Sequence, residues 1–215
     1  MKILAAAVSA IVFYLIMCTV INTRSENKLN FPQNIMFSDK LSTVISAVGA
    51  IMSCTALYIQ SAKTITLRLI LLYILCIGLA LATVSDIKTK IISNKLILVL
   101  LCVWIIFSLI YFVIDFQIGL ANIIMSFTGF IFSLLVFGSG YLLMKNKLGG
   151  GDVKLTLVMG LILTGDAIFG ALIYGLAASL IFAAVAMITK KMKMKDSMPF
   201  APFLFLGTAA AIAVM

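Results

Sequence analysis

Long apolar stretches separated by short polar connections dominate the chain. About 20 apolar residues suffice to cross the ~30 Å hydrocarbon core of a bilayer as a helix, which satisfies its backbone polar groups internally. By that rule we expect eight spans, at Ile3–Ile21, Leu41–Tyr58, Ile65–Val84, Leu96–Ile114, Leu120–Met144, Leu155–Thr164, Ala167–Ile188 and Phe200–Val214. The pattern predicts an all-α fold, a polytopic helical bundle within the lipid bilayer.

The N-terminal stretch fits two interpretations, a cleaved secretory signal or a first span. Met1 and Lys2 precede the apolar run Ile3–Ile21, which is longer than the ~7–15 residues of a signal's apolar region and is followed by no clear small-x-small cleavage site. We therefore expect a retained span. The connection Asn22–Lys40, which contains Pro32, has neither helical nor strand periodicity and is expected to be a loop.

The sixth stretch is too short to span. From Asp152 to Thr164, before a break at Gly165-Asp166, a helix would extend about 20 Å at about 1.5 Å per residue, against the ~30 Å required. If the break lies at one membrane surface, the Asp152 end must begin below the other. Irregular backbone at that depth must line a cavity or be buried in protein. We therefore expect a hollow around Asp152.

Composition excludes a soluble domain and makes the basic residues informative about orientation. Apolar residues make up 64% of the chain and charged residues 11%. The net charge of +9 would suggest nucleic acid in a soluble protein, but here the lysines lie in short loops, so we expect no nucleic-acid partner. Lys and Arg near span ends are retained on the cytoplasmic side. We interpret the loop lysines as determining topology, and we expect them to stay clear of any cleft that binds a basic peptide.

Eight spans with the N-terminus outside place nearly all of the 16 Lys and Arg residues in the cytoplasm. The exceptions are Lys2, Lys63 and Arg68. In this orientation Asp86 and Asp152 fall on the cytoplasmic side, as does the loop Asn22–Lys40, whereas Asp115 and Asp166 fall on the outer side. The chain is expected to be a multi-pass protein of the cytoplasmic membrane.

Cysteine and histidine usage narrows the possible chemistry. The four cysteines lie in separate apolar runs with no CxxC pair, so the sequence supports neither a disulfide framework nor a metal site. Histidine is absent, which removes His-based triads. Any general acid or base must be Asp, Glu, Lys, Tyr or Cys.

Asp86 and Asp152 are the candidates for catalysis. Two carboxylates that share a site cannot both ionise, so one stays protonated as an acid while the other activates water for attack on a peptide carbonyl. This chemistry requires no metal or cofactor, and we expect none. The glycines Gly149, Gly150 and Gly151 would let backbone approach a substrate strand closely.

Both aspartates also have structural explanations. Asp152 could be the N-cap of a helix, which Asp does well, and Asp86 could be a turn residue at a helix end, helped by Ser85. Ser93 and Asn94 are expected to cap the fourth helix. The residues alone leave the catalytic and structural interpretations open.

Three motifs, in order, resemble those of the type IV prepilin peptidase family, membrane aspartic proteases of the GxGD type. They are Asp86–Asn94, similar to an Asp followed by a basic stretch and Ile-Pro-Asn; Gly149–Leu155, similar to GxGD-x-Lys-Leu; and Met198–Leu204, similar to a Pro-Phe motif opening the last helix. The resemblance covers roughly residues 81–215. Ser93 stands where the family often has proline.

The resemblance implies roles for individual residues and a substrate. Asp86 and Asp152 would be the catalytic pair, with Gly149 and Gly151 as the glycines of the GxGD motif. Further residues in the motifs would bind substrate or shape the site, namely Gly150, Lys154, Asn94, Pro199 and Pro202. The family removes short basic leader peptides from pilin-like precursors, typically after a glycine and before a hydrophobic helix. The partners would thus be a pilin-like precursor and the lipid bilayer.

The resemblance also bears on organisation. Bifunctional bacterial members carry a cytoplasmic region with paired CxxC motifs and methylate the new pilin terminus. Asn22–Lys40 contains no cysteine, so we expect peptidase activity without methylation. Residues 1–80 would form N-terminal helices and residues 81–215 the peptidase domain. Two alternatives stay open: a presenilin-like intramembrane protease, and a small transporter whose two aspartates bind a cation or relay protons.

Overall fold

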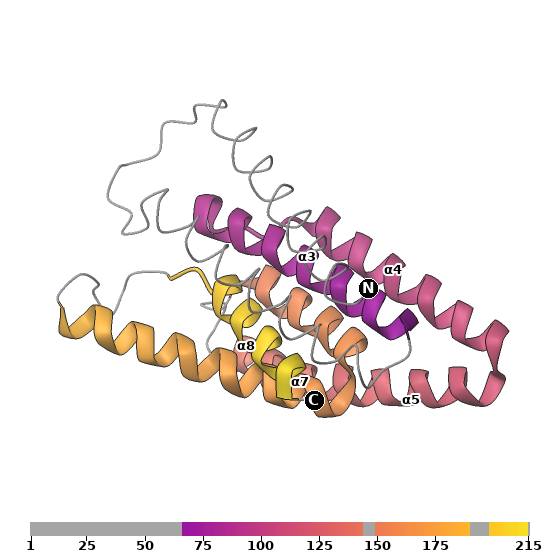
Figure 1. Cartoon of the computed structure of the whole chain (residues 1–215). Helices are drawn as coiled ribbons and strands as arrows, with labels where there is room; N and C mark the ends of the chain where they lie inside the picture. The colour runs from indigo at the N-terminus through magenta and orange to yellow at the C-terminus, as the bar shows by residue number, and fades with distance from the viewer. Residues whose placement is uncertain (1–65, 144–148, 190–197, 215) are drawn as a thin grey trace, which may run out of the picture.

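The computed structural model describes residues 66–143, 149–189 and 198–214, and these residues form helices without any strand (Figure 1). The elements are α3 (Thr66–Thr89), α4 (Asn94–Ile114), α5 (Phe116–Ser133), the π-helix η1 (Leu134–Gly138), α6 (Ser139–Leu143), α7 (Gly150–Ile188) and α8 (Ala201–Val214). The expected all-α fold is thus confirmed for this part of the chain. The first two expected spans and the loop between them lie outside the described residues.

Four helical stretches are long and apolar enough to cross a membrane. They are Leu67–Thr89, Asn94–Ile114, Phe116–Leu143 and Ala167–Ile188. Each corresponds to one of the expected spans, with ends shifted by several residues at most. The chain is a multi-pass membrane protein. The total of eight spans and the external N-terminus stay predictions.

The outer helices turn apolar side chains away from the protein. On α4, Leu98, Ile106 and Leu109 are more than half exposed, and α5 exposes Phe116 and Ile124 in the same way. Large exposed apolar surface of this extent is unfavourable in water but matches a hydrocarbon environment. These faces are therefore suited to contact lipid.

Helix α7 is broken near its middle. Thr164 has φ 66° and ψ 174°, which is not helical, and the chain turns back there (Figure 1). We call residues 150–163 the short half of α7 and residues 165–188 the long half. The short half extends about 21 Å at about 1.5 Å per residue, less than the ~30 Å of a span. The expected short sixth segment is confirmed, with its break at Thr164 instead of at Gly165-Asp166.

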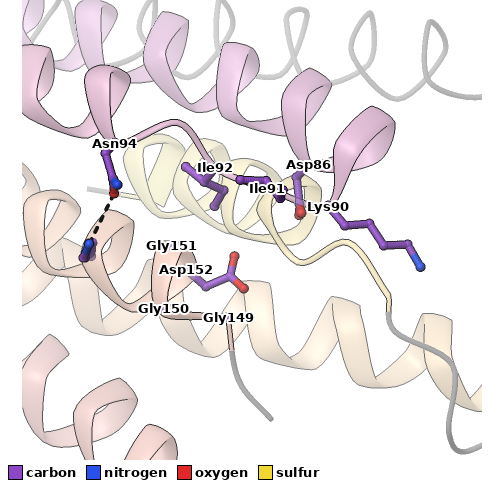
Figure 2. A pocket seen from close by; sticks show the side chains of 10 residues that line it. Asp86, Lys90, Ile91, Ile92, Asn94, Gly149, Gly150, Gly151 and Asp152 are labelled. Carbon is purple, nitrogen blue, oxygen red and sulfur yellow. Dashed lines mark hydrogen bonds between the residues drawn. The ribbon is translucent and has the colours of Figure 1, made fainter. Parts of the chain in front are cut away.

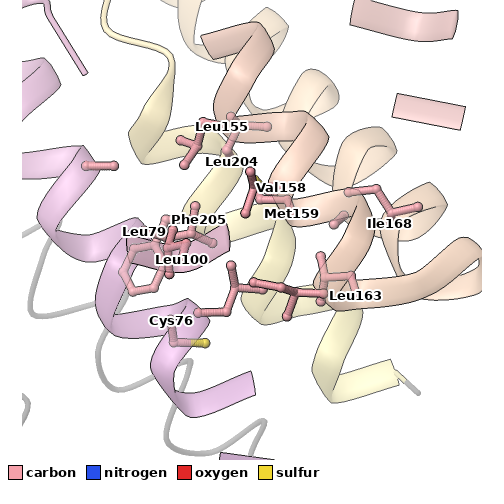
Figure 3. Packing of buried hydrophobic residues seen from close by; sticks show 14 of the residues in the cluster. Cys76, Leu79, Leu100, Leu155, Val158, Met159, Leu163, Ile168, Leu204 and Phe205 are labelled. Atoms are coloured by element: carbon pink, nitrogen blue, oxygen red, sulfur yellow. The ribbon is translucent and has the colours of Figure 1, made fainter. Parts of the chain in front are cut away.

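The core lies between α3, the short half of α7 and α8 (Figure 3). Leu155, Met159 and Leu163 are fully buried and recur every four residues, so they form one stripe along the short half of α7. Leu79 of α3 and Phe205 of α8 are also fully buried in the same cluster. The short half of α7 and helix α8 are thus enclosed by protein.

Glycines allow two helix pairs to approach closely. A Cβ added at Gly160 would lie 2.5 Å from the carbonyl oxygen of Gly129, so α5 and the short half of α7 cross with their backbones in contact. A Cβ at Gly207 of α8 would lie 2.5 Å from the backbone nitrogen of Gly175 in the long half of α7. Small residues permit such approaches in membrane bundles. These crossings hold both halves of α7 in fixed positions.

Candidate active site

Asp86 lies in the last turn of α3 and is 5% exposed. Its Oδ2 accepts a hydrogen bond of 2.9 Å from the backbone N–H of Ala201, the first residue of α8. The structural alternative for Asp86 was a turn residue, but its side chain reaches across the bundle to a residue 115 positions away. A buried carboxylate with a distant backbone donor links the end of one helix to the start of another.

In the first turn of α8, the backbone N–H of Ala201 is the group that donates to Asp86. The N–H groups of Phe203 and Leu204 donate to the carbonyl of Phe200 at 3.0 and 3.3 Å, and Pro202 has no N–H. The first N–H groups of a helix otherwise lack partners, and Ala201 donates its own to Asp86. Asp86 therefore caps α8 from outside the helix.

The prolines of the third motif flank this cap. Pro202 lies in the first turn of α8, where a missing N–H costs nothing, and Pro199 is buried just before the helix. Neither proline lines the cavity described below. Phe200 packs on Phe137 of η1, with ring centroids 5.6 Å apart.

The turn after Asp86 is held by side chains of the same helix. The N–H of Lys90 donates to the Asp86 carbonyl at 2.8 Å, and Lys90 adopts φ 53°, a left-handed conformation that ends the helix. The Ser85 hydroxyl then donates to the Ile91 carbonyl at 2.9 Å. Ile91, Ile92 and Ser93 follow without helical structure and lead into α4.

The expected capping of the fourth helix is only partly correct. Ser93 occupies the N-cap position of α4, but its side chain makes no capping hydrogen bond. The amide oxygen of Asn94 instead accepts a hydrogen bond of 3.2 Å from Nζ of Lys154 on α7. This contact joins the starts of α4 and α7.

Asp152 lies in the first turn of α7 and is not its N-cap, which is Gly149. The N-cap explanation of Asp152 is therefore wrong. Its backbone N–H donates to the Gly149 carbonyl at 3.0 Å, and its Oδ1 is buried without a hydrogen-bond partner among the described residues. A buried polar atom without a partner is uncommon and costs free energy. Its position favours a role with a ligand.

The three glycines before Asp152 differ in what surrounds them. A Cβ at Gly149 would lie 2.8 Å from Oδ2 of Asp152, and a Cβ at Gly151 would lie 3.1 Å from Cβ of Ile92. A Cβ at Gly150 would meet nothing within 4 Å. The first and third glycines therefore provide space for the carboxylate and for the turn before α4, whereas the second is unconstrained.

Asp86 and Asp152 face the same cavity, which has a volume of about 340 Å³ (Figure 2). Its lining combines the C-terminal end of α3, the turn into α4 and the start of α7: Asp86, Lys90, Ile91, Ile92, Asn94, Gly149, Gly150, Gly151, Asp152 and Lys154. Seven of the nine residues singled out from the sequence thus lie together. The expectation that the loop lysines stay clear of the cleft is wrong for Lys90. Lys154 also lines the cavity, as its place in the second motif led us to expect.

The two carboxyl groups differ in their surroundings. Asp152 precedes the span Ala167–Ile188 and lies outside the four spans. Burial, and secondarily the negative charge of Asp86, raises the pKa of Asp152 to about 7. Asp86 has the Ala201 N–H as a hydrogen-bond donor to its Oδ2. Two carboxyl groups that share a site and interact in this way can perform acid and base chemistry.

The sequence did not predict every residue that lines the cavity. Ile91 and Ile92 lie within the first motif, but an isoleucine side chain gives no indication that it lines a cavity. The Ala201 N–H is a backbone group, so no side chain could reveal it. The proline-rich start of α8 was the available indication that this helix end has a special role.

Comparison with known proteins identifies one matching family. A model of the type IV leader peptidase family matches residues 73–188, which include both aspartates and all three glycines. No curated protein and no solved structure matches the chain.

Proposed function

Since the chain belongs to the type IV leader peptidase family, we propose that Asp86 and Asp152 are the catalytic pair of an aspartic endopeptidase. The observation that carries this proposal is their common position in one cavity, close enough for the charge of Asp86 to act on Asp152. The family implies a pilin precursor as substrate. The reaction would be hydrolysis of the peptide bond between leader and mature pilin, without methylation of the new N-terminus.

The surroundings of the two carboxyl groups suggest different roles. Asp86, whose Oδ2 accepts a hydrogen bond from the Ala201 N–H, is the base. Asp152, whose Oδ1 lacks a partner among the described residues and whose pKa is near neutrality, is the protonated acid. Because the groups interact, they titrate as a pair.

In the first step, Asp86 accepts a proton from a water molecule as the water oxygen attacks the scissile carbonyl carbon. Asp152 donates its proton to the carbonyl oxygen, which gives a neutral gem-diol. In the second step, the Asp86 proton passes to the amide nitrogen and the C–N bond breaks. Asp152 regains a proton from a gem-diol hydroxyl, so a carboxyl terminus and a free amine are released. Positioned acids and bases of this kind contribute about 10²–10⁴-fold each.

The cavity constrains how the leader lies. Lys90 and Lys154 line it, so a basic leader segment inside would be repelled. The cavity therefore accommodates the residues at the scissile bond, and the basic part of the leader lies outside. The distribution of Lys and Arg favours the cytoplasmic face for this site.

Co-expression with a candidate pilin precursor tests the proposal. We expect leader removal by the wild type and none by Asp86→Asn or Asp152→Asn. Asp115→Asn is the matched control, because Asp115 caps α5 through Gln117 and Ile118, and Asn caps equally well. Processing by either mutant at the wild-type level would show that the two aspartates are not the catalytic pair. The alternative, a transporter that uses these aspartates, predicts this result. A methylated mature terminus, seen by mass, would contradict the absence of methylation.

A further inference from the structure

The break in α7 combines backbone strain with a charged neighbour, at the end of the short half opposite Asp152. Thr164 has φ 66° and ψ 174°, a conformation that is essentially restricted to glycine and is strained in other residues. A β-branched residue is especially unfavourable there. The residue that tolerates such a conformation, glycine, stands one position later at Gly165, whereas the strained position itself is occupied by Thr164.

The Thr164 side chain has a specific partner. Its Oγ1 accepts a hydrogen bond of 3.4 Å from Nη2 of Arg68 in the first turn of α3. Arg68 is partly buried, and its charge also acts on Tyr111 of α4. Arg68 is the second residue of the span Leu67–Thr89, so its side chain begins at the end of the span.

Helix α5 holds the break from the other side. A Cβ added at Gly129 would lie 2.9 Å from the Thr164 carbonyl carbon, and one at Gly165 would lie 2.8 Å from Oγ1 of Thr128. Strained backbone persists only where its surroundings leave no alternative. Here α3 provides the hydrogen bond and α5 provides the close contact.

The short half of α7 connects this break to the active site. It is a continuous helix from Gly150 to Leu163, with Leu155, Met159 and Leu163 fully buried. A packed helix moves as a unit, so a shift or rotation at Thr164 displaces Asp152 as well. Displacement of a catalytic group by about 1 Å can reduce the rate by about 10²-fold.

We propose that Arg68 and Thr164 are positioning residues, which fix the far end of the short half of α7 and thereby set the position of Asp152 relative to Asp86. Neither residue touches the cavity. The strain at Thr164 is maintained because it fixes where the helix ends. This role rests on the proposed function of the aspartates.

Thr164→Gly is the decisive variant, because it removes both the strain and the hydroxyl. We expect a folded protein whose thermal midpoint equals or exceeds that of the wild type, while kcat for precursor cleavage falls about tenfold or more and KM stays within about twofold. Arg68→Gln should lower kcat similarly. Thr164→Ser retains the acceptor oxygen, so this variant should keep most of the wild-type kcat.

An activity-independent measurement separates this proposal from the proposed function. In a background without the four native cysteines, Ile91→Cys and Gly150→Cys place two thiols on opposite sides of the cavity. We expect their disulfide formation rate to change severalfold when Thr164→Gly is added and to be unaffected by Thr164→Ser. If the wild type cleaves no precursor, the proposed function fails, and the crosslinking rate still decides the positioning role. Unchanged crosslinking, or unchanged kcat in an active Thr164→Gly protein, would overturn it.

Discussion

The Oδ2 oxygen of Asp86 accepts a hydrogen bond of 2.9 Å from the backbone N–H of Ala201, and so joins the last turn of α3 to the first residue of α8. The same side chain faces the cavity that contains Asp152. One carboxyl group therefore has both a structural and a proposed catalytic role. Substitutions of Asp86 that remove only its charge can therefore be distinguished from those that also remove the oxygen that accepts the Ala201 N–H.

Asp86→Asn and Asp86→Ala should both lose cleavage by about 10²-fold or more, because neither can accept a proton from water. Asn retains an oxygen for the Ala201 N–H, whereas Ala leaves that helix end uncapped, at a cost of about 1 kcal/mol. Thermal unfolding in detergent should therefore show a lower midpoint for Asp86→Ala than for Asp86→Asn. Equal midpoints would contradict the structural role of the carboxylate.

Alanine substitutions of the three glycines should rank by the space that each glycine provides. Gly149→Ala presses on the Asp152 carboxylate, and Gly151→Ala presses on Ile92, so both should lower cleavage strongly. Gly150→Ala meets nothing within 4 Å and should have the smallest effect of the three. Initial cleavage rates at matched expression test the order. A Gly150→Ala protein as impaired as the other two would contradict the geometry.

Cleavage should decline as the pH rises through neutrality. The pKa of Asp152 is raised to about 7 by burial and by the Asp86 charge, so its proton is lost above that pH and the proposed acid disappears. A profile of kcat/KM between about pH 5 and about pH 9 should show an alkaline limb near 7. A flat profile to the upper limit would contradict the assignment of Asp152 as the acid.

The same shift has a consequence for stability. The pKa of an unfolded aspartate is about 4, so the folded protein binds this proton more tightly than the unfolded chain. The stabilisation is complete below about pH 4 and is lost as the pH rises through about 7. Asp152→Asn cannot ionise, so its thermal midpoint should depend less on pH across this range. An identical pH dependence in wild type and variant would count against the raised pKa.

Lys154 and Asn94 should act as one unit. Their hydrogen bond of 3.2 Å joins the starts of α7 and α4 beside the cavity. We expect Lys154→Met and Asn94→Ala each to lower kcat/KM by about two- to fivefold, and the double variant to be no worse, since residues in contact are not additive. Fully additive losses would show that the two side chains act separately.

The sequence predicted the parts of the site that depend on chain direction and helix length. Asp86 and Asp152 were paired because the charge pattern assigned them to the same side. The short apolar run predicted a break at Gly165-Asp166, and the structure has it at the preceding residue, Thr164. These signals are local, and the structure places both aspartates on one cavity. The roles of the individual site residues stay predictions.

Features that depend on tertiary contact could not be predicted. The cap from Asp86 to Ala201 joins residues 115 positions apart through a backbone group. The left-handed conformation of Lys90 gave no signal, because a lysine rarely adopts it. Lys90 was interpreted from charge counting alone, which identifies a membrane side but not a cavity wall, so its position in the lining was missed.

The most direct measurement is leader release from a purified pilin precursor by the purified, reconstituted protein, followed by mass spectrometry. The account predicts cleavage by the wild type and by Asp115→Asn, and no detectable product with Asp86→Asn or Asp152→Asn. Cleavage by either active-site variant at the wild-type rate would contradict the central claim that these two carboxyl groups perform the reaction.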